Sequence, residues 1–245
     1  MKYFVLFVFS LFLVISCSDN KNETMENVKA KICSRLKDNP TPEGILQAGR
    51  LFENEFGSKY ELSEKKLADY LVKLRPCFAE MGFTKEIKPM EEALQGEVSD
   101  YLALKKDVLK IVLKNVNAPA FSVDMEFTGL KKYTDSEKPE IGGSFVLFDK
   151  DKKELAKYNV YPVPDFYLTM EKGSGDFKFT VYLDAVWYPY GDKPFVKAAE
   201  YLQLMGNAEY YKMVLDLKNS KKSKQEEEKD DEILDNLQIL SAPNN

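Results

Sequence analysis

Hydrophobic residues recur at three- and four-residue steps in the first part of the chain, which places them on one face of a helix. Thr41-Pro42-Glu43 is a typical helix start, with a capping hydroxyl, a proline at the first helical position and an early acid. Pro76 removes a backbone donor and should kink or split its helix. The pattern predicts helices over 25–39, 41–57, 63–82 and 85–106.

Beyond residue 106 the period changes to two, which is typical of strands with one buried face. Residues 121–128 alternate apolar and polar positions without a fault. One helical stretch, 193–205, interrupts the series. The other predicted strands are 108–116, 144–149, 154–161, 166–171, 177–187 and 209–217. We therefore predict an α+β fold, in which an N-terminal helical region precedes a mainly antiparallel β-sandwich-like domain with one inserted helix.

The first sixteen residues have the pattern of a secretory signal peptide: Lys2, a short apolar run and small residues before a cleavage point. Val14-Ile15-Ser16-Cys17 resembles the lipobox of bacterial lipoproteins. That resemblance implies cleavage before Cys17, a lipid on its sulfur and attachment to a membrane through this lipid. It places the protein in the cell envelope, and Ser18 favours the outer membrane. An ordinary signal peptide followed by a chance cysteine is the alternative.

Cysteine usage agrees with export. Once Cys17 carries lipid, Cys33 and Cys77 remain, and an even count in an oxidising compartment suggests a disulfide. Two buried free thiols are the alternative. A bridge would join the first predicted helix to the third.

The predicted regions follow one another along the chain and end in a charged tail. Residues 218–232 are nearly all charged, and Ile233, Leu237 and Leu240 follow at helical spacing. This apolar end either docks on the body of the protein or binds a partner. The predicted regions are a signal peptide over 1–16, a lipidated tether over 17–24, a helical region over 25–106, a β-sandwich-like domain over 107–217 and a charged tail over 218–245.

Phe145-Val146-Leu147-Phe148-Asp149 resembles the motif that names the FxLYD domains, with Phe148 at the position of the family's tyrosine. The resemblance covers one strand–turn–strand stretch and implies a small β-sandwich of the kind found in exported prokaryotic proteins. It implies no catalytic residue. The glycine that the family has in the turn is absent between Asp149 and Lys153.

Charge and composition restrict the chemistry. The 245 residues include 35 basic and 40 acidic side chains, and the formal net charge is −5. Because nucleic-acid binding needs a clustered basic face, we expect no nucleic-acid partner. The chain has no histidine, which excludes Ser-His-Asp and Cys-His catalysis and removes the commonest zinc ligand. We expect a non-enzymatic protein with no cofactor and no metal.

The candidate binding residues are aromatic or apolar. Trp187, Tyr188 and Tyr190 follow a predicted strand and could anchor a protein partner or stack on a sugar. Packing of these rings against the body is the alternative. A membrane-anchored envelope or surface lipoprotein that binds a protein is the leading hypothesis. A glycan-binding module and a carboxylate-based hydrolase, which needs no histidine, are the alternatives.

Overall fold

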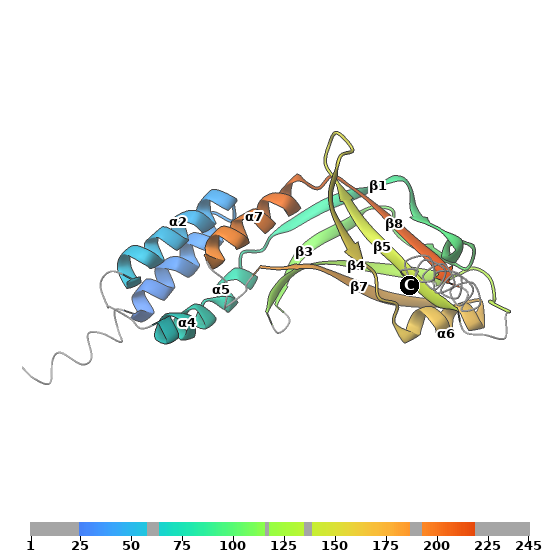
Figure 1. Cartoon of the computed structure of the whole chain (residues 1–245), viewed down its shortest axis with the longest axis horizontal. Helices are drawn as coiled ribbons and strands as arrows, with labels where there is room; N and C mark the ends of the chain where they lie inside the picture. Colours follow the sequence, from blue (N-terminus) through green and yellow to red (C-terminus); the bar gives the residue numbers. More distant parts are fainter. Residues whose placement is uncertain (1–24, 58–63, 116–117, 135–138, 187–192, 219–245) are drawn as a thin grey trace, which may run out of the picture. The chain divides into compact units, whose positions relative to one another are not determined.

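Figure 1 shows the computed structural model, which describes residues 25–57, 64–115, 118–134, 139–186 and 193–218. The chain divides into two compact units, each assembled from three segments. The helical unit contains the residues up to Lys85, with Ile111–Val123 and Tyr182–Asn207. The sheet unit contains Glu86–Lys110, Asp124–Val181 and the residues from Ala208 onward. Within the described residues, no helix is long and apolar enough to span a membrane.

The helical unit begins with a helix over residues 25–38. The other helices are α2 (Pro42–Phe52), which continues into a π turn, η1 (Glu53–Gly57), then α4 (Glu64–Lys73), α5 (Arg75–Ala79) and α7 (Pro194–Asn207). Thr41 caps α2, because its hydroxyl accepts a hydrogen bond of 3.1 Å from the Gly44 amide. The predicted start of α2 and the split at Pro76 are both confirmed.

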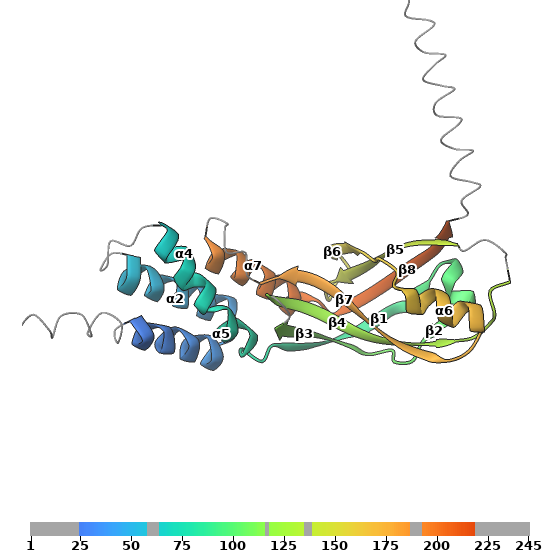
Figure 2. The same ribbon diagram turned by 90° about the horizontal axis from the view of Figure 1, so that it is seen from below.

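Aromatic rings form the centre of the helical unit. The ring of Phe195 on α7 lies 5.8 Å from the rings of Phe52 and Phe78, centroid to centroid. Gly49 on α2 permits this approach, since a Cβ at that position would lie 2.8 Å from the Cβ of Phe195. Figures 1 and 2 both show α2 and α7 side by side.

Eight strands form a single hydrogen-bonded sheet with the order β2-β4-β3-β1-β8-β5-β6, and β7 also pairs with β4. Their bounds are β1 Thr84–Gln95, β2 Leu102–Leu104, β3 Leu109–Asn115, β4 Pro119–Gly129, β5 Glu140–Phe148, β6 Glu154–Asn159, β7 Asp176–Ala185 and β8 Tyr210–Lys218. The pairs of β4 with β2 and β3, and of β5 with β6 and β8, are antiparallel, whereas β1 and β8 are parallel. The predicted α+β class is confirmed.

The helix predicted over 85–106 is wrong. This segment forms β1, a short 3-10 helix η2 (Glu97–Asp100) and β2. Ile87 and Leu94 are its well-buried apolar residues in β1, and their seven-residue separation also fits a helix. Pairing with β8, far along the chain, decides the outcome, and an irregularity between Pro89 and Leu94 breaks the simple alternation.

The strand predicted over 166–171 is also wrong, because these residues belong to α6 (Pro164–Lys172). Pro164 occupies its first turn, and Gly173 ends it with a left-handed backbone, φ 70°. Phe166, Thr169 and Met170 are buried at helical spacing. The remaining predicted strands are confirmed with small shifts in their bounds, as is the helix predicted over 193–205.

Candidate functional site

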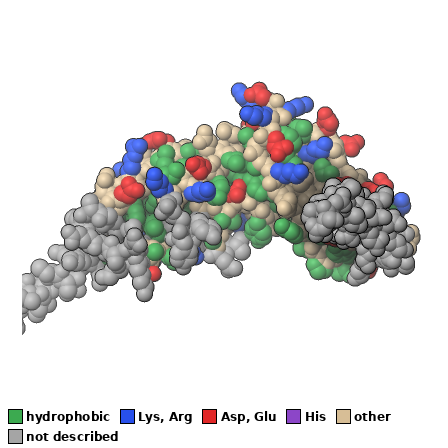
Figure 3. All heavy atoms as spheres, in the orientation of Figure 1, with side chains coloured by type: hydrophobic (Ala, Val, Ile, Leu, Met, Phe, Trp, Pro, Cys, Tyr) green, Lys and Arg blue, Asp and Glu red, His purple; other side chains and the backbone are tan. Residues whose placement is uncertain are grey.

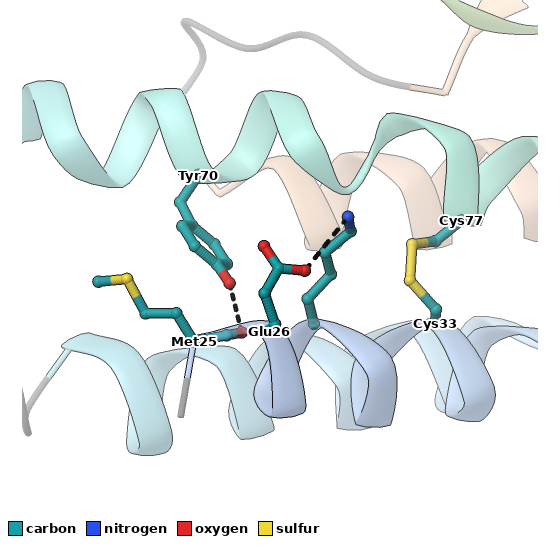
Figure 4. Close-up of a disulfide and its surroundings, with 6 residues drawn as sticks. Met25, Glu26, Cys33, Tyr70 and Cys77 are labelled. Carbon is teal, nitrogen blue, oxygen red and sulfur yellow. Dashed lines mark hydrogen bonds and ion pairs between the residues drawn. A yellow bond between two sulfur atoms is a disulfide. The ribbon is translucent and has the colours of Figure 1, made fainter. Parts of the chain in front are cut away.

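The predicted disulfide is present. Cys33 of the helix over 25–38 is bonded to Cys77 of α5, with their Cα atoms 4.9 Å apart (Figure 4). The helix over 25–38 is also joined to α4, because the hydroxyl of Tyr70 on α4 donates a hydrogen bond to the carbonyl oxygen of Met25. Burial raises the pKa of Tyr70 to about 12, and the charge of Glu26 adds to the effect. The hydrogen bond holds the beginning of the first helix, and the disulfide holds its second half.

The other site residues predicted from the sequence lie outside the described residues: Cys17, Trp187, Tyr188, Tyr190, Ile233, Leu237 and Leu240. The structure does describe the residues that flank the aromatic group. Val186 at the end of β7 donates a backbone hydrogen bond of 2.8 Å to Pro119, and α7 begins at Pro194. The aromatic residues themselves lie outside the described residues, so their position and their role stay predictions.

The sheet unit has an aromatic core beneath α6. Phe166 of α6 is fully buried and lies 5.0 Å from the rings of Phe177 and Phe179 on β7. Phe127 of β4 stacks on Phe177 at 5.2 Å. Because these rings come from a helix and two strands, they fix α6 firmly against one face of the sheet.

The opposite face of the same strands is polar, and its side chains bind one another. Lys105 contacts Asp176 at 2.7 Å, and Thr180 donates to Asp124 at 2.7 Å. The hydrogen bond from Lys105 lowers the pKa of Asp176, and the same bond raises the pKa of Lys105. Lys105 and Asp176 neutralise each other, and the carboxylate of Asp124 accepts the hydrogen bond from Thr180, so these groups are already engaged within the protein.

The segment after β4 lies against α6 through backbone hydrogen bonds. Tyr133 donates to Met170 on α6, and Leu130 donates to Tyr101, each at 2.8 Å. A Cβ at Gly173 would lie 2.5 Å from the backbone nitrogen of Lys132, so the two chains touch at the end of the helix. Residues 129–133, Tyr101 and α6 therefore form one fixed assembly.

Apolar side chains on this assembly, and one just before it in the sequence, are exposed to solvent. Leu168 on α6 is 47% exposed, Leu130 is 55% exposed, and Tyr161, which precedes the helix, is 76% exposed. The rings of Tyr101 and Tyr133 pack edge to face at 5.4 Å. We call these five residues the α6 surface. Figure 3 shows hydrophobic side chains gathered where α6 lies.

Three exposed lysines border the α6 surface. The ammonium of Lys131 lies 5.2 Å from the centre of the Tyr101 ring. Lys132 is beside Gly173, and Lys172 is the last residue of α6. Within the described parts of the chain, the side-chain ion pairs involve other lysines. These three charges form a basic rim that is available to an acidic ligand.

The described residues offer no metal site, and their most buried tyrosine has a structural role. They contain no group of three or more His, Cys, Asp and Glu side chains that could hold a metal ion. Burial raises the pKa of Tyr211, whose hydroxyl donates to the Asp107 carbonyl oxygen at 2.9 Å. Its hydrogen bond and its stacking on Phe145 show that Tyr211 is a structural residue of the core.

Comparison with protein-family models, with curated proteins and with solved structures finds no match for this chain. The FxLYD resemblance therefore stays a prediction.

Sequence reasoning missed the α6 surface. Leu130 and Leu168 are apolar residues in a chain with a large core, and only the tertiary structure shows that they face solvent. A usable signal was Tyr161-Pro162-Val163-Pro164, since two prolines next to an aromatic residue favour a short exposed connection before a helix.

Proposed function

We propose that this chain is a lipid-anchored, non-enzymatic protein of the cell envelope that binds a protein partner on the α6 surface. One observation carries the proposal: Leu130, Leu168 and Tyr161 are exposed around a helix that an aromatic core and backbone hydrogen bonds hold in place. Exposed apolar side chains on a rigid backbone are typical of binding surfaces, because water leaves them when a partner binds.

Two features of the sequence support the location. The lipobox-like stretch ending at Cys17 supplies the anchor, and the bond between Cys33 and Cys77 suits an oxidising compartment. A tether over 17–24 spans up to roughly 26–29 Å when extended, at about 3.3–3.6 Å per residue. That length would keep the first helix close to the membrane surface, and Ser18 favours the outer membrane.

The test is capture of a partner in cells that express the protein at its natural level. Chemical cross-linking followed by purification should enrich the same protein with the wild-type chain in repeated experiments. Leu168→Asp should reduce that enrichment about tenfold, because a carboxylate at a contact site costs about 1.4 kcal/mol or more of binding free energy. Combination with Leu130→Asp should abolish it.

The matched control is Val196→Asp, which places the same charge at a 40% exposed aliphatic residue on α7 of the helical unit. It should leave capture unchanged. Equal loss with Val196→Asp and Leu168→Asp would indicate a general defect. Full capture by the Leu168→Asp and Leu130→Asp double variant would place the partner elsewhere and contradict the proposal.

A glycan ligand is the second candidate, and the exposure of Tyr161, 76%, favours it, since a free ring can stack on a sugar. A glycan array would separate the two functions. Binding that Tyr161→Ala or the pair Trp187→Ala and Tyr190→Ala removes would support the glycan. No glycan binding, together with capture that depends on Leu168, would support the protein partner.

A further inference from the structure

The last strand ends at the same end of the sheet unit as the α6 surface. The backbone amide of Leu217, at the end of β8, donates to the carboxylate of Glu97 at 3.1 Å. Glu97 begins η2, and Tyr101 of the α6 surface directly follows that short helix. Figures 1 and 2 both place the end of β8 at the same end of the sheet unit as α6. The chain that follows Lys218 therefore starts near this surface.

The sequence of that following chain complements the α6 surface in charge and in hydrophobicity. Residues 226–232 are EEEKDDE, with six acids and one lysine, and Ile233, Leu237 and Leu240 come next. An acidic stretch next to an apolar stretch matches a basic rim next to an apolar surface. The spacing of the three apolar residues would place them on one face of a helix.

We propose that residues 233–240 bind the α6 surface of the same chain, with the acidic run 226–232 against Lys131, Lys132 and Lys172. The tail then acts as an internal competitor, and a partner must displace it. The displacement step rests on the proposed function, whereas the docking of the tail does not.

Chain length permits this contact. Fourteen residues lie between Lys218 and Ile233, which corresponds to a root-mean-square separation of roughly 19–22 Å for a flexible chain. Attachment at that length gives the tail an effective concentration of about millimolar at the surface. A modest apolar contact is therefore sufficient for high occupancy in the same molecule, although the same peptide added separately would bind weakly.

Photo-cross-linking of the purified full-length protein tests the docking. A p-benzoylphenylalanine at Leu168 should cross-link to a peptide within 233–245 in dilute protein, and a mixture of isotopically light and heavy chains should give products within one chain. Leu237→Asp should lower the yield about tenfold, since it places a charge at the apolar contact. Asn236→Asp, which adds the same charge at a polar neighbour, should not.

Charge-reversal variants test the contact between the acidic run and the lysines. Lys131→Glu with Lys132→Glu should lower the yield several-fold, and Glu227→Lys with Glu228→Lys in the same chain should restore it. The docking is overturned if the cross-links join different chains, avoid the tail, or persist with Leu237→Asp.

The two proposals fail separately. Cross-linking to the tail in purified protein, combined with partner capture that ignores Leu168, would keep the docking and reject the proposed function. Capture that depends on Leu168 without any tail cross-link would do the reverse. If both hold, deletion of 233–245 should increase partner capture several-fold, and unchanged capture would reject the competitor role.

Discussion

At the scale of single residues, the tightest approach in the helical unit lies between Gly49 and Phe195. Gly49→Ala should lower the free energy of unfolding by about 1–3 kcal/mol, because the new methyl group would overlap Phe195 and force the two helices apart. Urea denaturation measures the change. Gly206→Ala on α7 is the control, since a Cβ there meets nothing within 4 Å, and it should leave stability unchanged or slightly higher.

Tyr70 makes a second prediction at this scale. Its pKa is about 12 in the folded protein against 10.0 for an ordinary tyrosine, so the unfolded chain loses the proton first as the pH rises. Stability is therefore retained below about pH 10 and lost progressively between 10 and 12. Tyr70→Phe should be less stable at pH 8, having lost the hydrogen bond to Met25, but should decline less steeply above pH 10.

Spectrophotometric titration of tyrosine gives the independent measurement. The wild type should have one more late-titrating group than Tyr70→Phe, and Tyr211 should still titrate late in both. Identical titration curves would contradict the assignment.

Residues whose role is local could be predicted from the sequence. Thr41 and Pro42 start a helix through their own backbone and side-chain chemistry. The pairing of Cys33 with Cys77 is long-range, but it could be predicted from the cysteine count, because only these two remain once Cys17 is set aside for the lipid. The candidate site could not be predicted in this way. Whether an apolar residue such as Leu168 is buried depends on what packs over it, which the local sequence does not contain.

At the scale of elements, the end of α6 controls the position of the neighbouring segment. Gly173→Ala should lower the free energy of unfolding by about 1–3 kcal/mol, because φ is 70° and the added Cβ would overlap the Lys132 backbone. Gly175→Ala also has a positive φ, 101°, but its Cβ would meet nothing within 4 Å. Gly175→Ala should therefore lower the free energy of unfolding by only about 1 kcal/mol, and the difference between the two variants measures the cost of the overlap.

The disulfide joins two elements across a sequence separation of 44 residues. Cys33→Ala with Cys77→Ala should lower the free energy of unfolding by about 4 kcal/mol on the chain-entropy model. Thermal unfolding measures the change, and a reducing agent should lower the Tm of the wild type without affecting the double variant. An equal effect of the reducing agent on both proteins would contradict the role of the bond.

Elements stabilised by distant partners account for the wrong predictions. The strand β1 depends on pairing with β8, which the local sequence does not contain, and the seven-residue spacing of Ile87 and Leu94 fits a helix as well as a strand. The residues of α6 include Phe166, Tyr167 and Thr169, which are common in strands, and burial against β4 and β7 overrides that preference. Strands such as β4, whose alternation is complete, were predicted well.

At the scale of the whole molecule, the proposed lipid anchor on Cys17 predicts in which cell fraction the protein is found. Cys17→Ala should move the protein from the membrane fraction to the soluble fraction after cell lysis, because the lipid attachment is lost. Blotting of the two fractions measures the shift. Retention of the variant in the membrane fraction would contradict lipid anchoring.

The face of the membrane requires a different measurement. Protease treatment of intact cells should remove the signal of a protein exposed on the surface, and should leave a periplasmic protein intact until lysis. Either result is consistent with the cell envelope. A lysed control is included, because a chain that stays intact there is one that the protease cannot cut.

The division of each unit among three segments has a consequence for biogenesis. The core of the helical unit needs Phe195 of α7, and the sheet unit needs β8, so neither core can close until almost the whole chain is available. If the chain is exported across the inner membrane from its N-terminus, as the proposed location requires, it stays open for most of its passage. Cys33 and Cys77 would reach the oxidising side early, and their bond could guide the first helices before either core exists.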